Sequence, residues 1–265
     1  LRNYLHLMSI TILYYDHLIT LGSEARHIWT HAPTFGSITF LLNRYVAFGG
    51  NVAVTVYSFK TLAGKVRHVS CKHESLFRQI LLIVNVVLSG VILTGRTYAL
   101  WNRSKRVLAI MLGSAAVLVA IACWSMLGGT TSAAPNTTGC HINISLSAGI
   151  RESTGWEAGF LYDILIFVLT VARTYRTPRV NLRKPTRIGV NLVHLLLRDG
   201  GNSYSQSIMA CANLSNILTF YDSLRGVLST FASTVSVVAV SRLTLNLYET
   251  AERGGASQSA SGSSA

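Results

Sequence analysis

The chain has 265 residues, half of them apolar and only 12% charged, and its formal net charge is +13. Soluble domains carry about a quarter charged residues, so this composition excludes an ordinary soluble domain. Uncharged stretches of roughly 18 or more residues predict membrane-spanning helices, which makes the lipid bilayer the first expected partner. Lys and Arg then belong to cytoplasmic loops and helix ends. No soluble basic module with interleaved aromatic residues is present, so nucleic-acid binding is not expected.

Seven apolar stretches predict seven spans. In chain order they cover residues 5–21, 35–59, 76–100, 107–127, 156–175, 204–221 and 224–247. At about 1.5 Å per residue each can cross a core of about 30 Å, the first and sixth only just. Residues 248–265 are rich in Gly, Ser and Ala, a composition that predicts a disordered tail. The sequence therefore predicts an all-α, integral membrane seven-helix bundle over residues 1–247.

Basic loops give the bundle a direction. The loop over residues 176–198 holds six basic residues, and the short turn after the third span holds Arg103, Lys105 and Arg106. The positive-inside rule places both in the cytoplasm, which predicts an N-terminus outside and a cytoplasmic C-terminus. The basic residues between the second and third spans violate the rule. They are Lys60, Lys65, Arg67 and Lys72.

The polar loop from residue 128 to residue 156 gives a second, independent direction. It holds two glycosylation acceptor triplets, which begin at Asn136 and Asn143, and such acceptors belong on the non-cytoplasmic side. Cys140 lies between them, and Cys71 precedes the third span on the same predicted side. An oxidising compartment permits a Cys71–Cys140 disulfide, which would pin the loop over the bundle. The alternative is two free thiols.

Charges inside the predicted spans need partners or water, because each costs about 2.5–3.5 kcal/mol to insert. Asp16 and Arg44 lie in the first two spans and can form an ion pair, either structural or part of a proton or ligand relay. Asp163 lies about two turns inside the fifth span and is a candidate for ligand contact. Asn213 and Asn216, three residues apart, share a helix face and either bind ligand or join helices.

The sequence predicts no enzyme, metal or cofactor. His27 and His31 have helical ligand spacing, but the cluster of His68, Cys71 and His73 is predicted on the opposite face of the membrane. Each cluster alone is too small for a metal centre. Phosphate-binding loops, nucleophile elbows and zincin motifs are missing from the sequence. In the second span, adjacent glycines at positions 49 and 50 predict a kink or a close helix approach.

A series of strings in chain order resembles a known family. They are residues 15–21, 40–45, 96–101, 139–141, 163–170, 197–200, 213–220, 224–231 and 241–247. Together they resemble the basidiomycete multi-pass membrane family called domain of unknown function 6533 (DUF6533), over nearly the whole chain. The resemblance implies a fungal source and an integral membrane protein. It brings no established activity.

Three functional hypotheses follow from these patterns. The first is a seven-helix receptor-like protein that senses a small extracellular ligand and meets a cytoplasmic partner at the basic loop 176–198, in the plasma membrane or an endomembrane. Arg96-Thr97-Tyr98 at the inner end of the third span loosely resembles the Arg-Tyr element of G-protein-coupled receptors, a fold-level analogy. The second is a small-solute or proton-coupled transporter. The third is a non-catalytic structural membrane protein.

Overall fold

The chain folds into long helices in a computed structural model, which describes residues 2–30, 32, 34–59, 65–126, 131–133, 142–144, 146–176, 201–221 and 226–262. The helices are α1 (Arg2–Glu24), the π-helical stretch η1 (Ala25–Trp29), α2 (Phe35–Phe59), α3 (Lys65–Leu100), α4 (Lys105–Met126), α5 (Leu146–Arg176), α7 (Gly201–Tyr221) and α8 (Ser229–Gly262). Two short strands, β1 (Thr131–Ala133) and β2 (Ile142–Ile144), pair antiparallel with Ser132 opposite Asn143. The predicted all-α fold is confirmed, while the small hairpin was not predicted.

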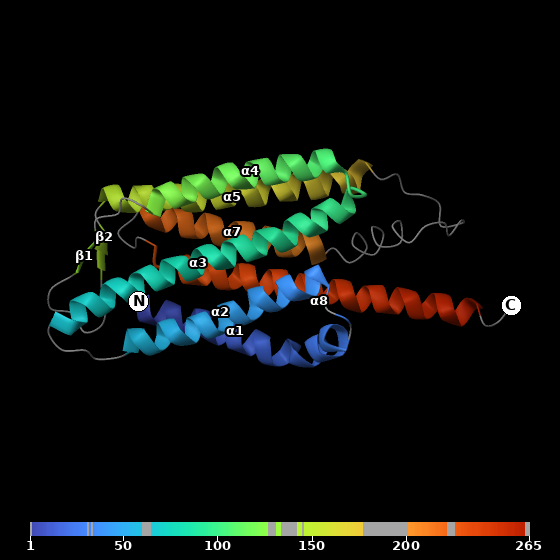
Figure 1. Ribbon diagram of the computed structural model, residues 1–265, viewed down its shortest axis with the longest axis horizontal. Helices are drawn as coiled ribbons and strands as arrows, with labels where there is room; N and C mark the ends of the chain where they lie inside the picture. Colours follow the sequence, from blue (N-terminus) through green and yellow to red (C-terminus); the bar gives the residue numbers. More distant parts are fainter. Residues whose placement is uncertain are drawn as a thin grey trace.

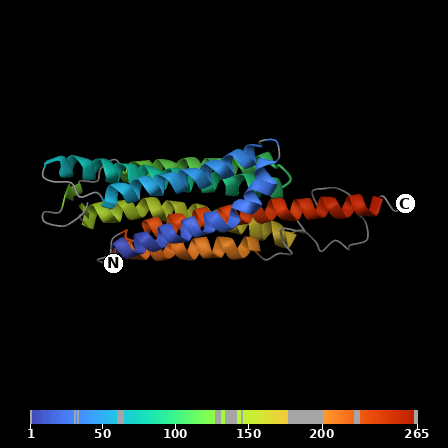
Figure 2. The same ribbon diagram turned by 90° about the horizontal axis from the view of Figure 1, so that it is seen from below.

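Successive helices run in opposite directions, side by side (Figures 1 and 2). The α1–α2 and α3–α4 connections lie at the end from which α8 projects, and we call this the C-terminal end of the bundle (Figure 1). The β1–β2 hairpin and the start of α8 lie at the opposite, N-terminal end (Figure 1). The first helix therefore begins at one end of the bundle and the last helix finishes beyond the other.

Among the described residues, four helices are long and apolar enough to cross a membrane, over Ser75–Leu100, Lys105–Ser125, Gly149–Arg173 and Ser229–Glu252. The protein thus has the character of a membrane protein. The other three long helices each carry buried polar residues, among them Asp16 in α1, Asn43 in α2 and Asn216 in α7. A bundle can hold such residues in its interior, where neighbouring helices supply partners.

Helix boundaries differ from the predicted spans mainly at the ends. α2 coincides with the predicted residues 35–59, whereas α3 begins at Lys65 and α5 at Leu146, both well before the predicted spans. The 36 residues of α3 extend about 54 Å, more than a bilayer core needs. Part of the basic segment that violated the positive-inside rule thus belongs to the first turns of α3, before Ser75. α8 continues to Gly262 through the segment predicted to be disordered, as an extension of a helix already nucleated in the bundle.

α8 is the central helix of the bundle. Of its membrane-length window 56% is buried, against 11% for α4, and α8 packs on α1, α2, α3 and α7. One apolar core cluster joins α3, α5, α7 and α8. Its buried members are Ile92, Leu93, Ile166, Met209, Val240 and Leu243. Because α8 touches so many neighbours, a displacement of α8 would be felt throughout the bundle.

The close helix approach predicted at residues 49 and 50 is confirmed for Gly50. A Cβ atom added to Gly50 would collide with the side chain of Leu81 on α3, whereas nothing lies within 4 Å of one added to Gly49. α2 and α3 are therefore in close contact at this point.

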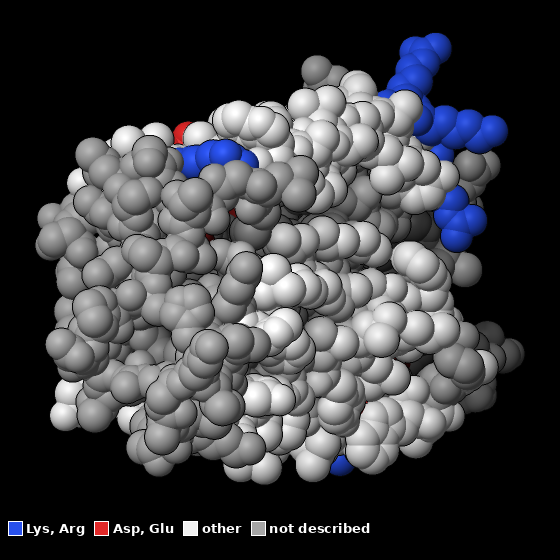
Figure 3. Space-filling view, turned by 60° about the vertical axis from the view of Figure 1, so that its left-hand side comes forward, with Lys and Arg blue, Asp and Glu red and all other residues white. Residues whose placement is uncertain are grey.

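Large apolar side chains cover much of the outside of the bundle, and one group of exposed basic residues lies at its C-terminal end. In the space-filling view the described flank is almost free of Lys and Arg, which cluster where α3 ends and α4 begins (Figure 3). The exposed basic residues of this turn are Arg103, Lys105 and Arg106. An apolar flank with a basic end suits a helix bundle seated in a bilayer.

Candidate functional site: a buried charge network between α1, α2 and α8

One face of α1 carries a stripe of polar side chains. His17, Thr20 and Glu24 are three and four residues apart, so they lie one above another on the helix. Glu24 is completely buried. Because α1 remains helical up to Glu24, this carboxylate lies inside the bundle and not in a loop.

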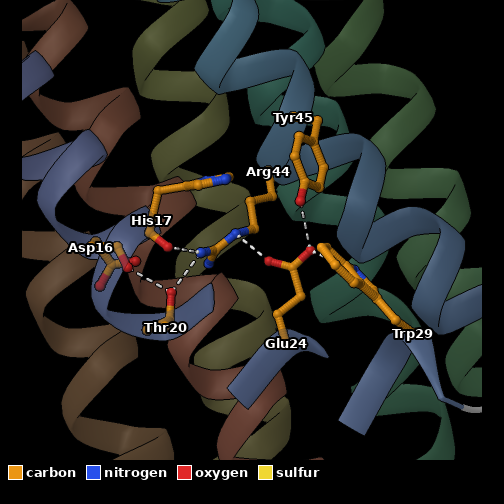
Figure 4. A network of polar contacts seen from close by, with 7 residues as sticks. All are labelled: Asp16, His17, Thr20, Glu24, Trp29, Arg44 and Tyr45. Atoms are coloured by element: carbon orange, nitrogen blue, oxygen red, sulfur yellow. Dashed lines mark hydrogen bonds and ion pairs between the residues drawn. The ribbon is translucent and has the colours of Figure 1, made fainter. Parts of the chain in front are cut away.

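Arg44 of α2 reaches this stripe and is held there by three residues of α1 (Figure 4). Its Nε lies 2.8 Å from Glu24 Oε2, and the two side chains are 2% and 0% exposed. Its Nη2 donates to the backbone oxygen of His17 at 2.8 Å and to the Thr20 hydroxyl at 2.6 Å. A buried guanidinium needs such a set of acceptors, because taking a charge out of water costs several kcal/mol.

The second oxygen of Glu24 is also occupied. Its Oε1 accepts a hydrogen bond from the Tyr45 hydroxyl at 3.0 Å and another from Trp29 Nε1 at 3.1 Å (Figure 4). Trp29 follows Glu24 by five residues, the hydrogen-bond spacing of a π-helix, and η1 supplies that geometry. Both oxygens of Glu24 therefore have partners.

An ion pair and a histidine–carboxylate contact tie this region to α8. Arg242 Nε lies 2.5 Å from Asp16 Oδ1, with Arg242 half-exposed and Asp16 buried. His27 Nε2 lies 3.0 Å from Glu252 Oε2, and its other ring nitrogen is 2.8 Å from the Ser23 backbone oxygen. We call the whole set the α1 network. Its members are Asp16, His17, Thr20, Glu24, His27, Trp29, Arg44, Tyr45, Arg242 and Glu252.

The predicted pairing of Asp16 with Arg44 was wrong, although each residue does form an ion pair. Arg44 pairs with Glu24, and Asp16 pairs with Arg242. The reason is angular, since adjacent residues differ by about 100° around an α-helix. Asp16 therefore points away from the stripe that faces α2 and toward α8.

The sequence analysis did not include Glu24 or Arg242 among the site residues, although a feature of the sequence pointed to each of them. The predicted first span ended at residue 21, but the polar spacing of the stripe continues to Glu24. Arg242 lies inside the predicted seventh span. Because a charge inside a span needs a partner, its presence there predicted an acidic residue on a neighbouring helix.

The predicted ligand contacts Asp163, Asn213 and Asn216 lie in a second region, between α5, α7 and α8. Asn213 Nδ2 donates to Asp163 Oδ2 at 2.7 Å and so joins α7 to α5. Asn216 is completely buried and accepts a bond from the Ser229 hydroxyl at 3.3 Å, which joins α7 to α8. For Asn213 and Asn216, the sequence analysis gave hydrogen bonding between helices as the alternative to ligand binding, and these contacts are of that kind. Asp163 is deeper than predicted, about four turns from the start of its membrane-length window at Gly149.

Several predicted features lie outside the described residues. Cys140, Asn136, His31 and residues 177–198 of the basic loop are among them, and so are the side chains of Cys71 and Asn143, whose backbones belong to α3 and β2. The predicted disulfide and both glycosylation sites therefore remain predictions.

The chemistry available to the α1 network is charge pairing. Arg44 is paired with Glu24 and Arg242 with Asp16, so these two pairs are neutral overall. Within the described part of the chain, no group of three or more His, Cys, Asp or Glu side chains could hold a metal ion. The arrangement is suited to holding three helices together at the C-terminal end.

The fold and this network define the class: a helical membrane protein whose first, second and last helices are joined by buried charge. Residues 4–49 match the family described as Family of unknown function (DUF6533). The resemblance to DUF6533 is thus confirmed for this segment, which covers most of α1, all of η1 and the first part of α2. Every member of the α1 network except Arg242 and Glu252 lies in it. No match to a curated protein or to a solved structure was found.

Proposed function

We propose that this protein is a receptor-like, non-catalytic membrane protein of seven spans that senses a small extracellular ligand, with its N-terminus outside and its C-terminus in the cytoplasm. The orientation is supported by the basic C-terminal end of the bundle, where Arg103, Lys105 and Arg106 are exposed (Figure 3). The two predicted acceptor triplets of the opposite end agree with it. The plasma membrane or an endomembrane fits this orientation.

One observation carries the receptor hypothesis: α8 bears different contacts in its two halves. Near its outer end, Ser229 and Ser233 make uncharged hydrogen bonds to Asn216 and Asn85. Toward its inner end, Arg242 makes an ion pair to Asp16 of α1, and Glu252 contacts His27 of η1. A ligand that displaced α8 at the outer polar contacts would alter the inner charged ones, which gives a physical link between the two faces of the membrane.

The coupling can be tested without knowing the ligand. In a protein whose own cysteines have been replaced, a cysteine substituted for Thr250 near the inner end of α8 is labelled with a water-soluble maleimide. Asn216→Leu removes the outer contact to Ser229, and we expect it to change the labelling rate at least about twofold, since coupling between sites is typically 1–3 kcal/mol.

The matched control is Ser215→Ala, because the Ser215 hydroxyl donates within its own helix to the Cys211 backbone oxygen. This control should leave the labelling rate unchanged. Equal rates in the wild type and in Asn216→Leu would contradict coupling through α8.

A proton-coupled transporter is the second candidate, because of Asp163. This carboxylate lies inside the membrane-length part of α5 and has no salt-bridge partner among the described residues. Unpaired intramembrane acids are typical of proton relays. Proteoliposomes loaded with a pH-sensitive dye separate the two hypotheses. The receptor hypothesis expects the same proton leak for wild type and Asp163→Asn, and a leak that Asp163→Asn abolishes would favour transport.

A further inference from the structure

Four buried polar side chains meet where α2, α3 and α8 come together. They are Asn43, Asn85, Ser89 and Ser233, with exposed fractions of 0%, 3%, 4% and 5%. We call them the amide cluster. Asn85 and Ser89 are one turn apart on the same face of α3, so the cluster occupies a single region of the interior.

The hydrogen bonds within the amide cluster are long. Ser89 Oγ donates to Asn43 Oδ1 at 3.2 Å, and Asn85 Nδ2 donates to Ser233 Oγ at 3.5 Å. Ordinary O–H···O and N–H···O bonds are about 2.7–2.8 Å and 2.9–3.0 Å. The side chains of the cluster are thus further apart than direct hydrogen bonding alone would place them.

Each of the two amides has one atom without a partner. Among the described residues, neither Asn43 Nδ2 nor Asn85 Oδ1 has a hydrogen-bond partner. Rotating either amide by 180° exchanges its oxygen and nitrogen, but one atom of each amide would still be left over. Ser89, one turn from Asn85, bonds Asn43 and so brings the two amides into one region. Leaving a buried polar atom unbonded costs about 1–3 kcal/mol, and one shared partner in this region would satisfy both.

We propose that the amide cluster is a binding site for a water molecule that bridges α2 and α3 beside α8, accepting a hydrogen bond from Asn43 and donating one to Asn85. Water can both accept and donate, so it satisfies either orientation of each amide. An ion fits poorly because all four side chains are neutral, and an isolated buried charge is very costly. Arg44, the next residue on α2, is turned to α1 and is paired there with Glu24. Buried waters of this kind typically make about three hydrogen bonds. The hydroxyl of Ser89 or Ser233 can form the third one.

An experimental structure at better than about 2 Å tests the site directly. We expect a density peak within hydrogen-bonding distance, about 2.7–3.2 Å, of both amide groups. An interior without such a peak, or a direct hydrogen bond between Asn43 and Asn85, would overturn the proposal.

A double-mutant cycle gives an independent test in solution. The unfolding equilibrium is measured by denaturant titration in mixed micelles for Asn43→Leu, Asn85→Leu and the double variant. Either single substitution breaks the bridge, so the second substitution has a smaller effect once the first is present. The change in the unfolding equilibrium constant of the double variant should therefore be at least about twofold smaller than the product of the two single changes.

The control cycle combines Asn43→Leu with Thr97→Val. The Thr97 hydroxyl donates within α3 to the Leu93 backbone oxygen, about 12 Å along the helix from Ser89. For the control pair, the change in the unfolding equilibrium constant of the double variant should equal the product of the two single changes. If the changes caused by Asn43→Leu and Asn85→Leu multiply in the same way, the bridge does not exist.

Discussion

Two adjacent residues of α2 face different neighbouring helices. Arg44 faces α1 and its buried acid, while Asn43 faces α3 and the amide cluster. Sequence reasoning recognised that Arg44 and Asp16 needed partners, because the cost of a buried charge follows from the residue type alone. It paired Arg44 with Asp16 and missed Glu24, since the true partner depends on how far each helix is rotated about its axis when it packs.

The ion pairs of the α1 network should differ strongly in their contribution to stability. Glu24→Gln leaves the guanidinium of Arg44 buried without its counter-charge, and we expect a loss of about 3–5 kcal/mol in the free energy of unfolding. Arg242→Gln leaves the buried carboxylate of Asp16 without its counter-charge, but the arginine of this pair is 51% exposed, so the loss should be smaller than that of Glu24→Gln. Denaturant titration in mixed micelles measures both.

A double variant identifies the cause of the larger effect. Glu24→Gln/Arg44→Met removes both charges, and it should be more stable than Glu24→Gln alone. If the double variant is instead less stable, the loss comes from packing and not from an unpaired charge.

At the scale of the element, α2 shows what a sequence pattern can and cannot predict. Its boundaries and its close approach to a neighbour followed from the apolar stretch and the paired glycines. The neighbour itself, and which of the two glycines meets it, did not follow, because contact between helices is set by tertiary packing. The longer helices α3 and α5 were shortened in the prediction for a similar reason: their first turns lie before the membrane-length windows, and hydropathy detects only the apolar part.

The two glycines of α2 make a matched pair for measuring helix packing. Gly50→Ala places a methyl group against Leu81, and overpacking of this kind costs about 1–3 kcal/mol. Gly49→Ala meets nothing within 4 Å and should be neutral or stabilising by up to about 1 kcal/mol, since alanine favours a helix over glycine.

Thermal unfolding of the two variants, purified in the same detergent, provides the comparison. A Gly50→Ala protein as stable as Gly49→Ala would show that α2 and α3 are not in close contact at this position.

At the scale of the whole molecule, the alternating helices leave the two ends of the bundle chemically different. The sequence predicted this alternation from the number of apolar stretches and their loops. It could not predict that α8, the last helix, lies at the centre and touches helices from the whole length of the chain. Such contacts join residues separated by more than 200 positions, as in the pairing of Arg242 with Asp16, and no local pattern encodes them.

The proposed orientation predicts glycosylation of the loop between α4 and α5. When the chain is produced in a eukaryotic cell, glycosidase treatment should increase its electrophoretic mobility. Asn136→Gln/Asn143→Gln should migrate like the treated wild type and be insensitive to the enzyme. An unmodified wild type would remove one of the two arguments for an external N-terminus. A glycan on an acceptor triplet engineered into residues 177–198 would show that the real orientation is the opposite of the proposed one.

The π-helical turn η1 has a consequence for chain length. A π-helix holds about one residue more per turn than an α-helix, and here the extra residue sets the five-residue interval between Glu24 and Trp29. Removing a single residue, such as Ala25, would close the turn as an ordinary α-helical one, with Trp29 four residues after Glu24 and still near the same face of the helix. The same deletion in the middle of α1 would instead rotate one half of that helix against the other by about 100°. A one-residue deletion should therefore disturb the bundle less at this junction than inside α1.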